Sequence, residues 1–392
     1  MKHFTILFGI FCLLSFPVNG QFSQQEDVDI INHVVHSKIL GEQRQIQIFL
    51  PPSYTDSGSN YPVLYLLDGQ LFFHHAVSLS KTFKQFKLTP EFIVVGINTP
   101  FPERYDLFGA QEDKFIEFIT SEVLPFIEDS YHTNDEKLLF GWQYAAGLAF
   151  DIMLDDTISF DSYLLASPIP IWDETDSLAD YSSLNTKLYF SVSHDEFQIN
   201  HAVNKLDSVL SSNAIKDLDW TFTKFSNEEH HSTGFPTLYH GIRSYFEYYY
   251  ELHAPNLQKF IGAGGLDYAY AYARERGRKY GFSPELSNWS KYTIIRSAIQ
   301  ANDYDHFNIF ADELVNDDFI RDMKYRCFEI AEYHEKNRNF EKALDIYNTM
   351  LVEFPDSSDL LKRIGNVYKS LNNRAESEKY FKKAAELSVN KE

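Results

Sequence analysis

The sequence has 392 residues, a length typical of two domains or of one large domain with a helical appendage. Hydrophobic residues make up 44% of it, so a substantial core can form, and its formal net charge is −21. This acidity argues against nucleic acid or an anionic membrane surface as a partner. Residues 321–392 hold 14 Lys and Arg against 13 Asp and Glu, a net of +1, so nearly all the acidity lies upstream.

The first twenty residues predict a secretory signal peptide. A short basic start precedes an apolar run from Phe4 to Pro17, and small residues at Val18 and Gly20 precede Gln21, where we expect cleavage. The alternative is a membrane anchor, but the run is short for spanning a bilayer and no basic stop-transfer cluster follows. We therefore expect an exported protein, periplasmic or secreted, with no membrane span after cleavage.

The sequence contains two cysteines, and the predicted cleavage removes one of them, Cys12. The mature chain then keeps Cys327 alone, so no intramolecular disulfide can form. Cys327 lies in an apolar helical pattern, which predicts a small core residue.

From about residue 45 to residue 225, short β-type runs alternate with helical ones. Helices are predicted over 111–131 and 144–154 by their amphipathic or apolar patterns. Several of the strand-length runs are nearly continuous in apolar residues, as expected for strands buried on both faces. They are 45–49, 62–67, 92–97, 137–140 and 187–192. This alternation predicts an α/β fold with a mainly parallel sheet flanked by helices.

The alternation of strand-type and helical patterns ends at about Glu251, where Pro255 and a Gly-rich stretch mark a domain boundary. We expect an α/β domain over 21–255, a connector over 256–285 and an all-α domain over 286–392.

The end of the chain repeats with a period of 34 residues, the period of tetratricopeptide repeats. Ile330 pairs with Ile364, Ala331 with Gly365, Tyr347 with Phe381, and Met350 with Ala384. Each set places a large apolar residue before a small one, then an aromatic residue, then a small or apolar one. Residues 292–314 resemble a degenerate third unit, which brings the array close to the minimum that buries a continuous face. We expect the helices to stack through Ile330, Tyr347, Ile364, Tyr368 and Phe381.

The most informative segment is KLLFGWQYAAGLAF, residues 137–150. An apolar strand leads into a sharp turn and then an apolar helix, which is the context of the G-x-S-x-G nucleophile elbow in α/β hydrolases. Gly141 stands two residues before the tip of this turn, and Ala145 and Ala146 follow it, so small residues remain where the turn needs them. The tip itself is Gln143.

Residues 37–246 resemble the Putative esterase family, which includes esterase D-like and siderophore-ester hydrolases. The resemblance rests on the order and spacing of several pieces, among them IFLPPSY (48–54), YPVLYLLDGQLFF (61–73), Arg104-Tyr105-Asp106, FIEFITSEVLPFIEDSY (115–131), ASPIPIW (166–172) and EHHSTGFPTLYHGIRSYF (229–246). It implies an α/β-hydrolase fold. Some members also carry a tetratricopeptide tail, so the resemblance extends over most of the mature chain.

The resemblance also assigns site residues. The family's catalytic histidine falls on His231, and its acid falls on Glu196 or Asp195. Gly69 and Gln70 match the loop that supplies one backbone N–H of the oxyanion hole, and the N–H of Tyr144 would supply the other. The serine nucleophile has no counterpart, because Gln143 stands at its position and Trp142 precedes it.

An amide is far too weak a nucleophile for acyl transfer, so Gln143 cannot replace the serine. Hydrolases of this kind that lose their nucleophile keep only about 10³–10⁴-fold acceleration over water. No Ser or Cys lies within three residues of Gln143 to take over.

Each site residue also has a structural interpretation. His231 can be a structural histidine of the old active-site floor, Asp195 and Glu196 solvated loop carboxylates, and Trp142 and Tyr144 packing residues. The pairs His74-His75 and His230-His231 lack the spacing of metal ligands, since adjacent residues seldom bind one ion. We expect neither a metal nor a cofactor.

Three functional hypotheses follow. In the first, the chain is a catalytically degenerate esterase homologue that binds an ester, a sugar-like ligand or a protein outside the cytoplasm. In the second, it is an active hydrolase of carboxylic esters or acylated sugars by a non-standard route. In the third, the hydrolase domain is a scaffold and the repeats bind a peptide or protein partner. Gln143 favours the first and the third.

Overall fold

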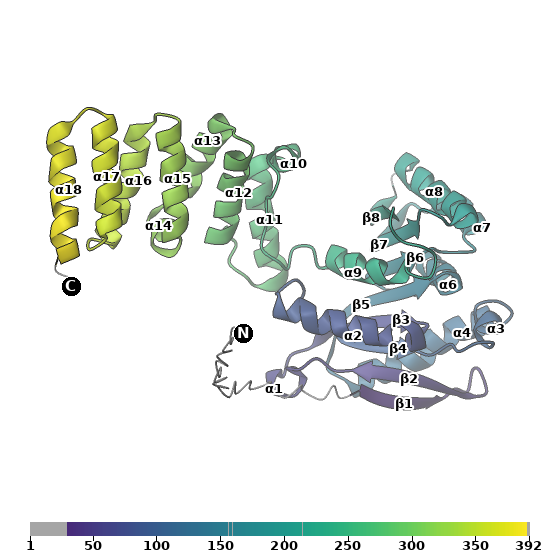
Figure 1. Cartoon of the computed structure of the whole chain (residues 1–392). Coiled ribbons are helices and arrows are strands. Elements are labelled where there is room, and N and C mark those ends of the chain that lie inside the picture. Colours follow the sequence, from purple (N-terminus) through teal and green to yellow (C-terminus); the bar gives the residue numbers. More distant parts are fainter. Residues whose placement is uncertain (1–29, 156, 159, 214, 390–392) are drawn as a thin grey trace, which may run out of the picture.

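We used a computed structural model, which describes residues 30–389 except 156, 159 and 214. The predicted signal peptide and its cleavage site lie outside the described residues. The described chain builds a mixed eight-stranded sheet covered by helices, and a row of helices leads away from it (Figure 1). None of the described helices combines the length and the apolar character needed to cross a bilayer.

The sheet has the strand order β1-β2-β4-β3-β5-β6-β7-β8. The strands from β4 to β8 run parallel in this order, and β1 and β2 pair antiparallel at one edge. The strands are β1 Ile30–His36, β2 Gln43–Phe49, β3 Tyr61–Leu67, β4 Ile93–Ile97, β5 Thr133–Trp142, β6 Ser162–Ala166, β7 Ser183–Ser193 and β8 Lys216–Phe225.

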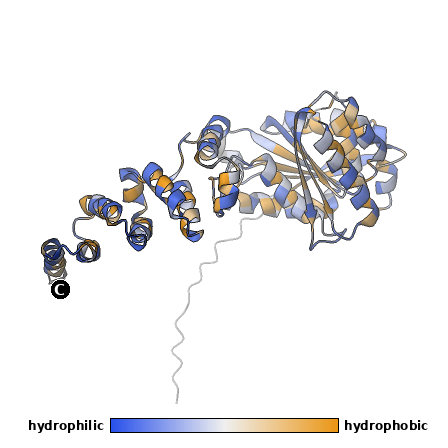
Figure 2. Ribbon diagram, turned by 90° about the horizontal axis from the view of Figure 1, so that it is seen from above, coloured by the Kyte–Doolittle hydropathy of each residue, from blue (hydrophilic) through white to orange (hydrophobic). Residues whose placement is uncertain are grey.

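Two layers of helices cover the sheet. In β3, the side chains of Val63 and Tyr65 enter one core and those of Leu64 and Leu66 enter the other, so both faces of the strand are buried. The helices of this region are α1 Tyr54–Ser57, α2 Gly69–Gln85, α3 Arg104–Leu107, α4 Glu112–Phe118, α5 Leu124–Ser130, α6 Tyr144–Leu154, α7 Trp172–Ser177, α8 Phe197–Ser212 and α9 Gly234–Tyr245. Figure 2 shows the apolar strands enclosed between these layers.

The prediction of an α/β sheet is confirmed, and each of the five predicted strands is present. The helix predicted over 144–154 is α6. The helix predicted over 111–131 is one helical stretch, in which a π-helical turn, Ile119–Val123, joins α4 to α5.

The helical region has a core of its own. Its helices are α10 Leu257–Gly262, α11 Gly265–Tyr280, α12 Asn288–Gln300, α13 Tyr304–Leu314, α14 Asp317–Asp322, α15 Lys324–Lys336, α16 Phe340–Glu353, α17 Ser358–Ser370 and α18 Arg374–Val389. Its core includes Leu257 and Phe260 of α10, so the segment expected to be a connector is itself helical and the helical region begins at α10.

Neighbouring helices pair as α12 with α13, α15 with α16 and α17 with α18. Of the expected stacking residues, Ile330, Tyr347 and Ile364 are fully buried, and Tyr368 is partly buried. Phe381 of α18 lies against Gly365 but stays 36% exposed. Cys327 is buried in this core as predicted, and burial raises the pKa of its thiol to about 12.

The helical region adjoins the sheet at the edge where the parallel strands begin. Lys279 and Tyr280 of α11 line a polar pocket of about 550 Å³ together with Tyr61 at the start of β3 and Asn134 and Glu136 of β5. The carboxyl ends of the strands, which carry α6, face away from the helical row (Figure 1).

Candidate functional site

The turn between β5 and α6 has the backbone of a nucleophile elbow. Gln143 has φ 58° and ψ −119°, a conformation uncommon for a residue with a side chain and one that stores strain. Its N–H donates to the carbonyl of Ala166 at 2.9 Å, and its carbonyl accepts from Ala146 and Gly147 at 3.0 Å each. These bonds hold the turn at the carboxyl edge of the sheet, where α/β folds place ligands.

The small residues around the turn are required by its geometry. A Cβ on Gly141 would lie 2.3 Å from the carbonyl oxygen of Ala145, and one on Gly147 would lie 2.5 Å from that of Ile169. Ala145 and Ala146 are fully buried. The elbow geometry expected from the sequence is therefore present, with an amide side chain at its tip.

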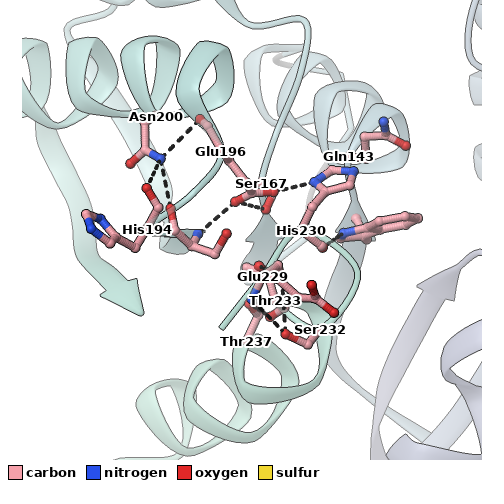
Figure 3. Close-up of polar contacts among 12 residues, drawn as sticks. Gln143, Ser167, His194, Glu196, Asn200, Glu229, His230, Ser232, Thr233 and Thr237 are labelled. Atoms are coloured by element: carbon pink, nitrogen blue, oxygen red, sulfur yellow. Dashed lines mark hydrogen bonds and ion pairs between the residues drawn. The ribbon is translucent and has the colours of Figure 1, made fainter. Parts of the chain in front are cut away.

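The histidine that meets a carboxylate is His230, one residue before the expected His231. His230 Nδ1 is hydrogen bonded to Glu196 Oε1, and Figure 3 shows the pair beside the elbow. The loop is held in this register by Trp142, whose Nε1 donates to the carbonyl oxygen of His230 at 3.0 Å. The His231 ring lies 6.1 Å from the Trp142 ring, against 5.0 Å for His230.

Of the two candidate acids, Glu196 is buried and Asp195 is exposed. Glu196 Oε2 accepts from the backbone N–H of Ser193 at 2.7 Å and from the hydroxyl of Ser167 at 2.9 Å. Burial by itself raises the pKa of Glu196, but the bonds from His230, Ser193 and Ser167 outweigh it and hold the pKa below its usual value. Glu196 is therefore ionised at neutral pH, and it orients His230 with Nδ1 as the donor.

Ser167, which the sequence reasoning did not consider, follows β6 and is fully buried. Its hydroxyl donates to Glu196, so it helps to fix the carboxylate. Its position directly after a buried strand at the carboxyl edge was a signal in the sequence, although serine is common at such positions.

The expected oxyanion donors lie at two helix starts. Gly69 and Gln70 open α2, and Tyr144 opens α6, so their N–H groups have no acceptor within the helix. Gly69 packs so close to β4 that a Cβ would lie 2.7 Å from the backbone of Gly96. The Gln70 side chain bonds to both backbone groups of Thr99 at 2.9 Å, which ties the α2 start to the loop after β4.

Arg104, which is named in the sequence only as part of a piece that resembles the family, joins these loops. It is 1% exposed, and its Nε and Nη2 donate to the two carboxylate oxygens of Asp68 at 2.8 Å each. Nη2 also donates to the carbonyl of Trp142 at 3.0 Å, and Nη1 donates to Gln143 Oε1 at 3.4 Å. One guanidinium thus connects the end of β3, the end of β5 and the elbow tip.

A cleft of about 900 Å³ opens beside the elbow. Tyr144 and Ile169 line it on the elbow side, and Trp172 and Phe197 line it from α7 and α8. Phe197 is 90% exposed, and Trp172 is also exposed. Trp142 is buried and packs, whereas Tyr144 faces the cleft. Exposed aromatic side chains around a concave apolar wall are typical of a binding site.

Among the described residues, no three His, Cys, Asp or Glu side chains gather in a way that could hold a metal ion. The site is therefore an elbow carrying an amide, an ionised carboxylate that orients an imidazole, two helix starts with N–H donors, and an aromatic cleft.

Comparison with known proteins agrees with this geometry. The eight-stranded sheet, the elbow and the flanking helices define an α/β-hydrolase-like fold. Residues 37–232 match the family described as "Putative esterase", and the chain belongs to that family.

The structure resembles two solved structures. They are an IroE-like serine hydrolase from Shewanella oneidensis (21% identity, TM-score 0.53, 72% of this chain and 98% of that one) and a protein from Capnocytophaga ochracea (19% identity, TM-score 0.54, 87% and 99%). At these identities the likeness concerns the fold. A curated relative, YbbA of Bacillus subtilis strain 168, is 27% identical over 106 residues, which cover 24% of this chain and 42% of YbbA.

Proposed function

We propose that this chain is an exported member of the esterase family that binds a ligand in the cleft beside Gln143 and has lost serine-esterase chemistry. The observation that carries the proposal is the side chain at the elbow tip. An amide has no nucleophilic oxygen comparable to an activated serine, and Gln143 Oε1 is already the acceptor of a bond from Arg104. The aromatic cleft supports binding of an ester or a sugar-like ligand.

The test is hydrolysis of p-nitrophenyl acetate by the purified mature protein, with labelling by a fluorophosphonate that reacts with activated serines. We expect no label and no turnover above that of Gln143→Ala, because neither side chain attacks a carbonyl. The proposal would be contradicted by a turnover that is lost in His230→Ala and retained in His231→Ala.

That outcome would favour a second function, hydrolysis of carboxylic esters or acylated sugars with water as the nucleophile. The intact His230–Glu196 pair favours it, because a histidine oriented through Nδ1 presents Nε2 as a general base. The fluorophosphonate separates this route from a hidden serine, since attack by water forms no covalent adduct with the protein.

For the helical region, we propose tetratricopeptide-like repeats that receive a peptide or protein partner. The 34-residue period and the three helix pairs support this assignment. We expect a chain that lacks α12–α18 to keep its binding in the cleft and to lose the partner that the full chain captures. Capture of the same partner by the truncated chain would refute it.

A further inference from the structure

A second pocket lies where the helical region meets the sheet region. It is the polar pocket of about 550 Å³ that Lys279 and Tyr280 line, and its volume is typical of sites for small molecules. Its walls come from α11 and from segments that precede β3 and β4 or begin β5, at the amino edge of the sheet. The elbow and its cleft open at the opposite edge (Figure 1), so this pocket is a separate place in the fold.

The side chains that line this junction pocket are polar. Among the described residues around it, Pro62 and Pro90 are the only ones without a polar side-chain atom, and Leu, Ile, Val, Met and Phe are absent. Asn60, Thr89 and Asn134 add amides and a hydroxyl. The pocket therefore suits a polar molecule better than an apolar one.

Four charged side chains line the junction pocket, and two of them neutralise each other. Lys84 Nζ lies 2.7 Å from Glu91 Oε1, in an ion pair. The other two, Lys279 and Glu136, form no ion pair within the described chain, so the ammonium and the carboxylate lie more than 4 Å apart. A ligand thus meets one cation and one anion that no direct contact has neutralised.

Lys279 is half-buried and is the last residue but one of α11. Its Nζ lies 4.9 Å from the centre of the Tyr245 ring and 5.3 Å from that of Tyr280. These rings attract the ammonium but accept no ordinary hydrogen bond from it. Burial lowers the pKa of the Lys279 ammonium, and the charge of Glu136 opposes this effect. The N–H donors of Lys279 therefore have no acceptor within the described chain.

Glu136 has hydrogen bonds but no cationic partner. Its Oε1 accepts from the hydroxyl of Tyr245 at 3.0 Å, and its Oε2 accepts from the side-chain amide of Asn134 at 3.1 Å. Both donors are neutral, so the negative charge of Glu136 is not balanced by contact. A carboxylate has about four lone-pair sites, so each oxygen can accept a further hydrogen bond.

An ammonium and a carboxylate that lie near each other without contact match a molecule that carries the same two groups. The carboxylate of such a ligand meets Lys279 and its ammonium meets Glu136, so the four charges alternate in sign. A simple anion would be repelled by Glu136 and Glu91, and a simple cation would be repelled by Lys279 and Lys84.

We infer that the junction pocket binds a zwitterion, a free α-amino acid with a polar side chain. Lys279 binds the α-carboxylate and Glu136 binds the α-ammonium. This inference goes beyond the proposed function, because it involves neither Gln143 nor the cleft beside it. Since α11 and the sheet region both line the pocket, the ligand contacts both regions of the chain.

The experiment is calorimetric titration of the full chain with three matched probes. They are L-glutamine, L-glutaminamide, which lacks the carboxylate, and N-acetyl-L-glutamine, which lacks the ammonium. We expect L-glutamine to bind at least about tenfold more tightly than either derivative, because each derivative loses one hydrogen-bonded contact between charged groups.

Two variants assign these contacts to residues. Lys279→Met removes the ammonium and keeps the unbranched stem, and Glu136→Gln keeps the shape of the side chain and an acceptor for Tyr245. Each should lower the affinity for L-glutamine about tenfold or more. In Lys279→Met the preference over L-glutaminamide should fall to within about twofold, and in Glu136→Gln the preference over N-acetyl-L-glutamine should do the same.

The matched controls make the same change of charge one residue away. Arg278→Met removes a cation that is 72% exposed and pairs with Glu275, and Asp135→Asn removes an exposed carboxylate. Neither residue lines the junction pocket. Affinity for L-glutamine should stay within about twofold of the wild type in both controls, because exposed charges are screened.

Three results would overturn the inference: no saturable binding of L-glutamine, equal affinity for the three probes, or wild-type affinity in both pocket variants. Residues that only stabilise the junction would lower the unfolding temperature and leave the affinities unchanged, which is the third result. If one variant does not fold, the other decides with its matching derivative. None of these results touches the loss of serine chemistry, which rests on the p-nitrophenyl ester and fluorophosphonate measurements.

Discussion

Replacement of Arg104 by methionine should be among the most destabilising single changes in the sheet region. The substitution keeps an unbranched side chain, so the main loss is electrostatic. Asp68 is 0% exposed, and it would remain as a buried carboxylate without its cationic partner. Removing one partner of a buried pair costs about 3–5 kcal/mol, and the carbonyl of Trp142 loses a donor as well.

Arg44→Met is the matched control. Arg44 is also buried, but its carboxylate partners Glu42 and Glu103 are 48% and 56% exposed and return to water when it is removed. We expect a cost of about 1–2 kcal/mol, mainly from the lost bond to the carbonyl of Asn98. Removal of Arg104 therefore leaves a buried, unpaired carboxylate, whereas removal of Arg44 leaves carboxylates that water can solvate.

The assay is urea unfolding followed by fluorescence, since Trp142, Trp172 and Trp220 of the four tryptophans lie in the sheet region. With a slope of about 3 kcal/mol per molar urea, Arg104→Met should lower the midpoint by more than about 1 M. Adding Asp68→Asn to Arg104→Met should recover part of the loss, because the uncompensated charge is gone. Equal midpoints for Arg104→Met and Arg44→Met would refute this reasoning.

Three other perturbations test separate parts of the description. Gly141→Ala should lower the free energy of unfolding by about 1–3 kcal/mol, because the new Cβ would clash with the carbonyl of Ala145 at the elbow. In the control, Gly262→Ala in α10, the new Cβ has no atom within 4 Å. Equal unfolding midpoints for the two variants would contradict this. Burial, and then the hydrogen bond and charge of Glu112, raise the pKa of Asp151 to about 8 from 3.8. Over this pH range the folded chain keeps that proton while the unfolded chain loses it. The stability of the wild type relative to Asp151→Asn should therefore fall as pH rises from about 4 to 8. Parallel curves of unfolding free energy against pH for the two proteins would argue against it. Truncation after Ala254 should leave a soluble, cooperatively unfolding protein, because the buried residues of the described sheet cores end at Phe246 and the helical region adds only the partly buried Tyr280 to them. Aggregation would show that the helices complete that core.

The elements that were easiest to predict from the sequence are strands buried along their whole length. Strands such as β3 and β4 are buried along their whole length, so their residues form an apolar run that local pattern reveals. The edge strands β1 and β8 alternate between exposed and half-buried residues and carry many polar side chains, which resemble loops. The strand β6, Ser162–Ala166, was missed although it is buried along its whole length.

The site shows a similar limit. The elbow could be located from the sequence, because its small residues are dictated by contacts within a few positions of the turn. The choice between His230 and His231 depends on Glu196 and Trp142, which come from other parts of the chain. Arg104 was visible as an arginine between aromatic residues, but its link to Asp68 required the tertiary fold.

The helical row is attached at the amino edge of the sheet, and this position determines whether a ligand and a partner could bind at the same time. The elbow and its cleft open at the opposite edge, and β5 separates the two with ten residues, about 33 Å of extended chain. A partner held by the distal helices would leave the mouth of the cleft free. In the proposed functions, a small molecule in the cleft and a macromolecule on the distal helices would therefore not compete. β5 connects the two ends directly, from Glu136, whose carboxylate accepts a hydrogen bond from the hydroxyl of Tyr245, to Trp142 beside His230.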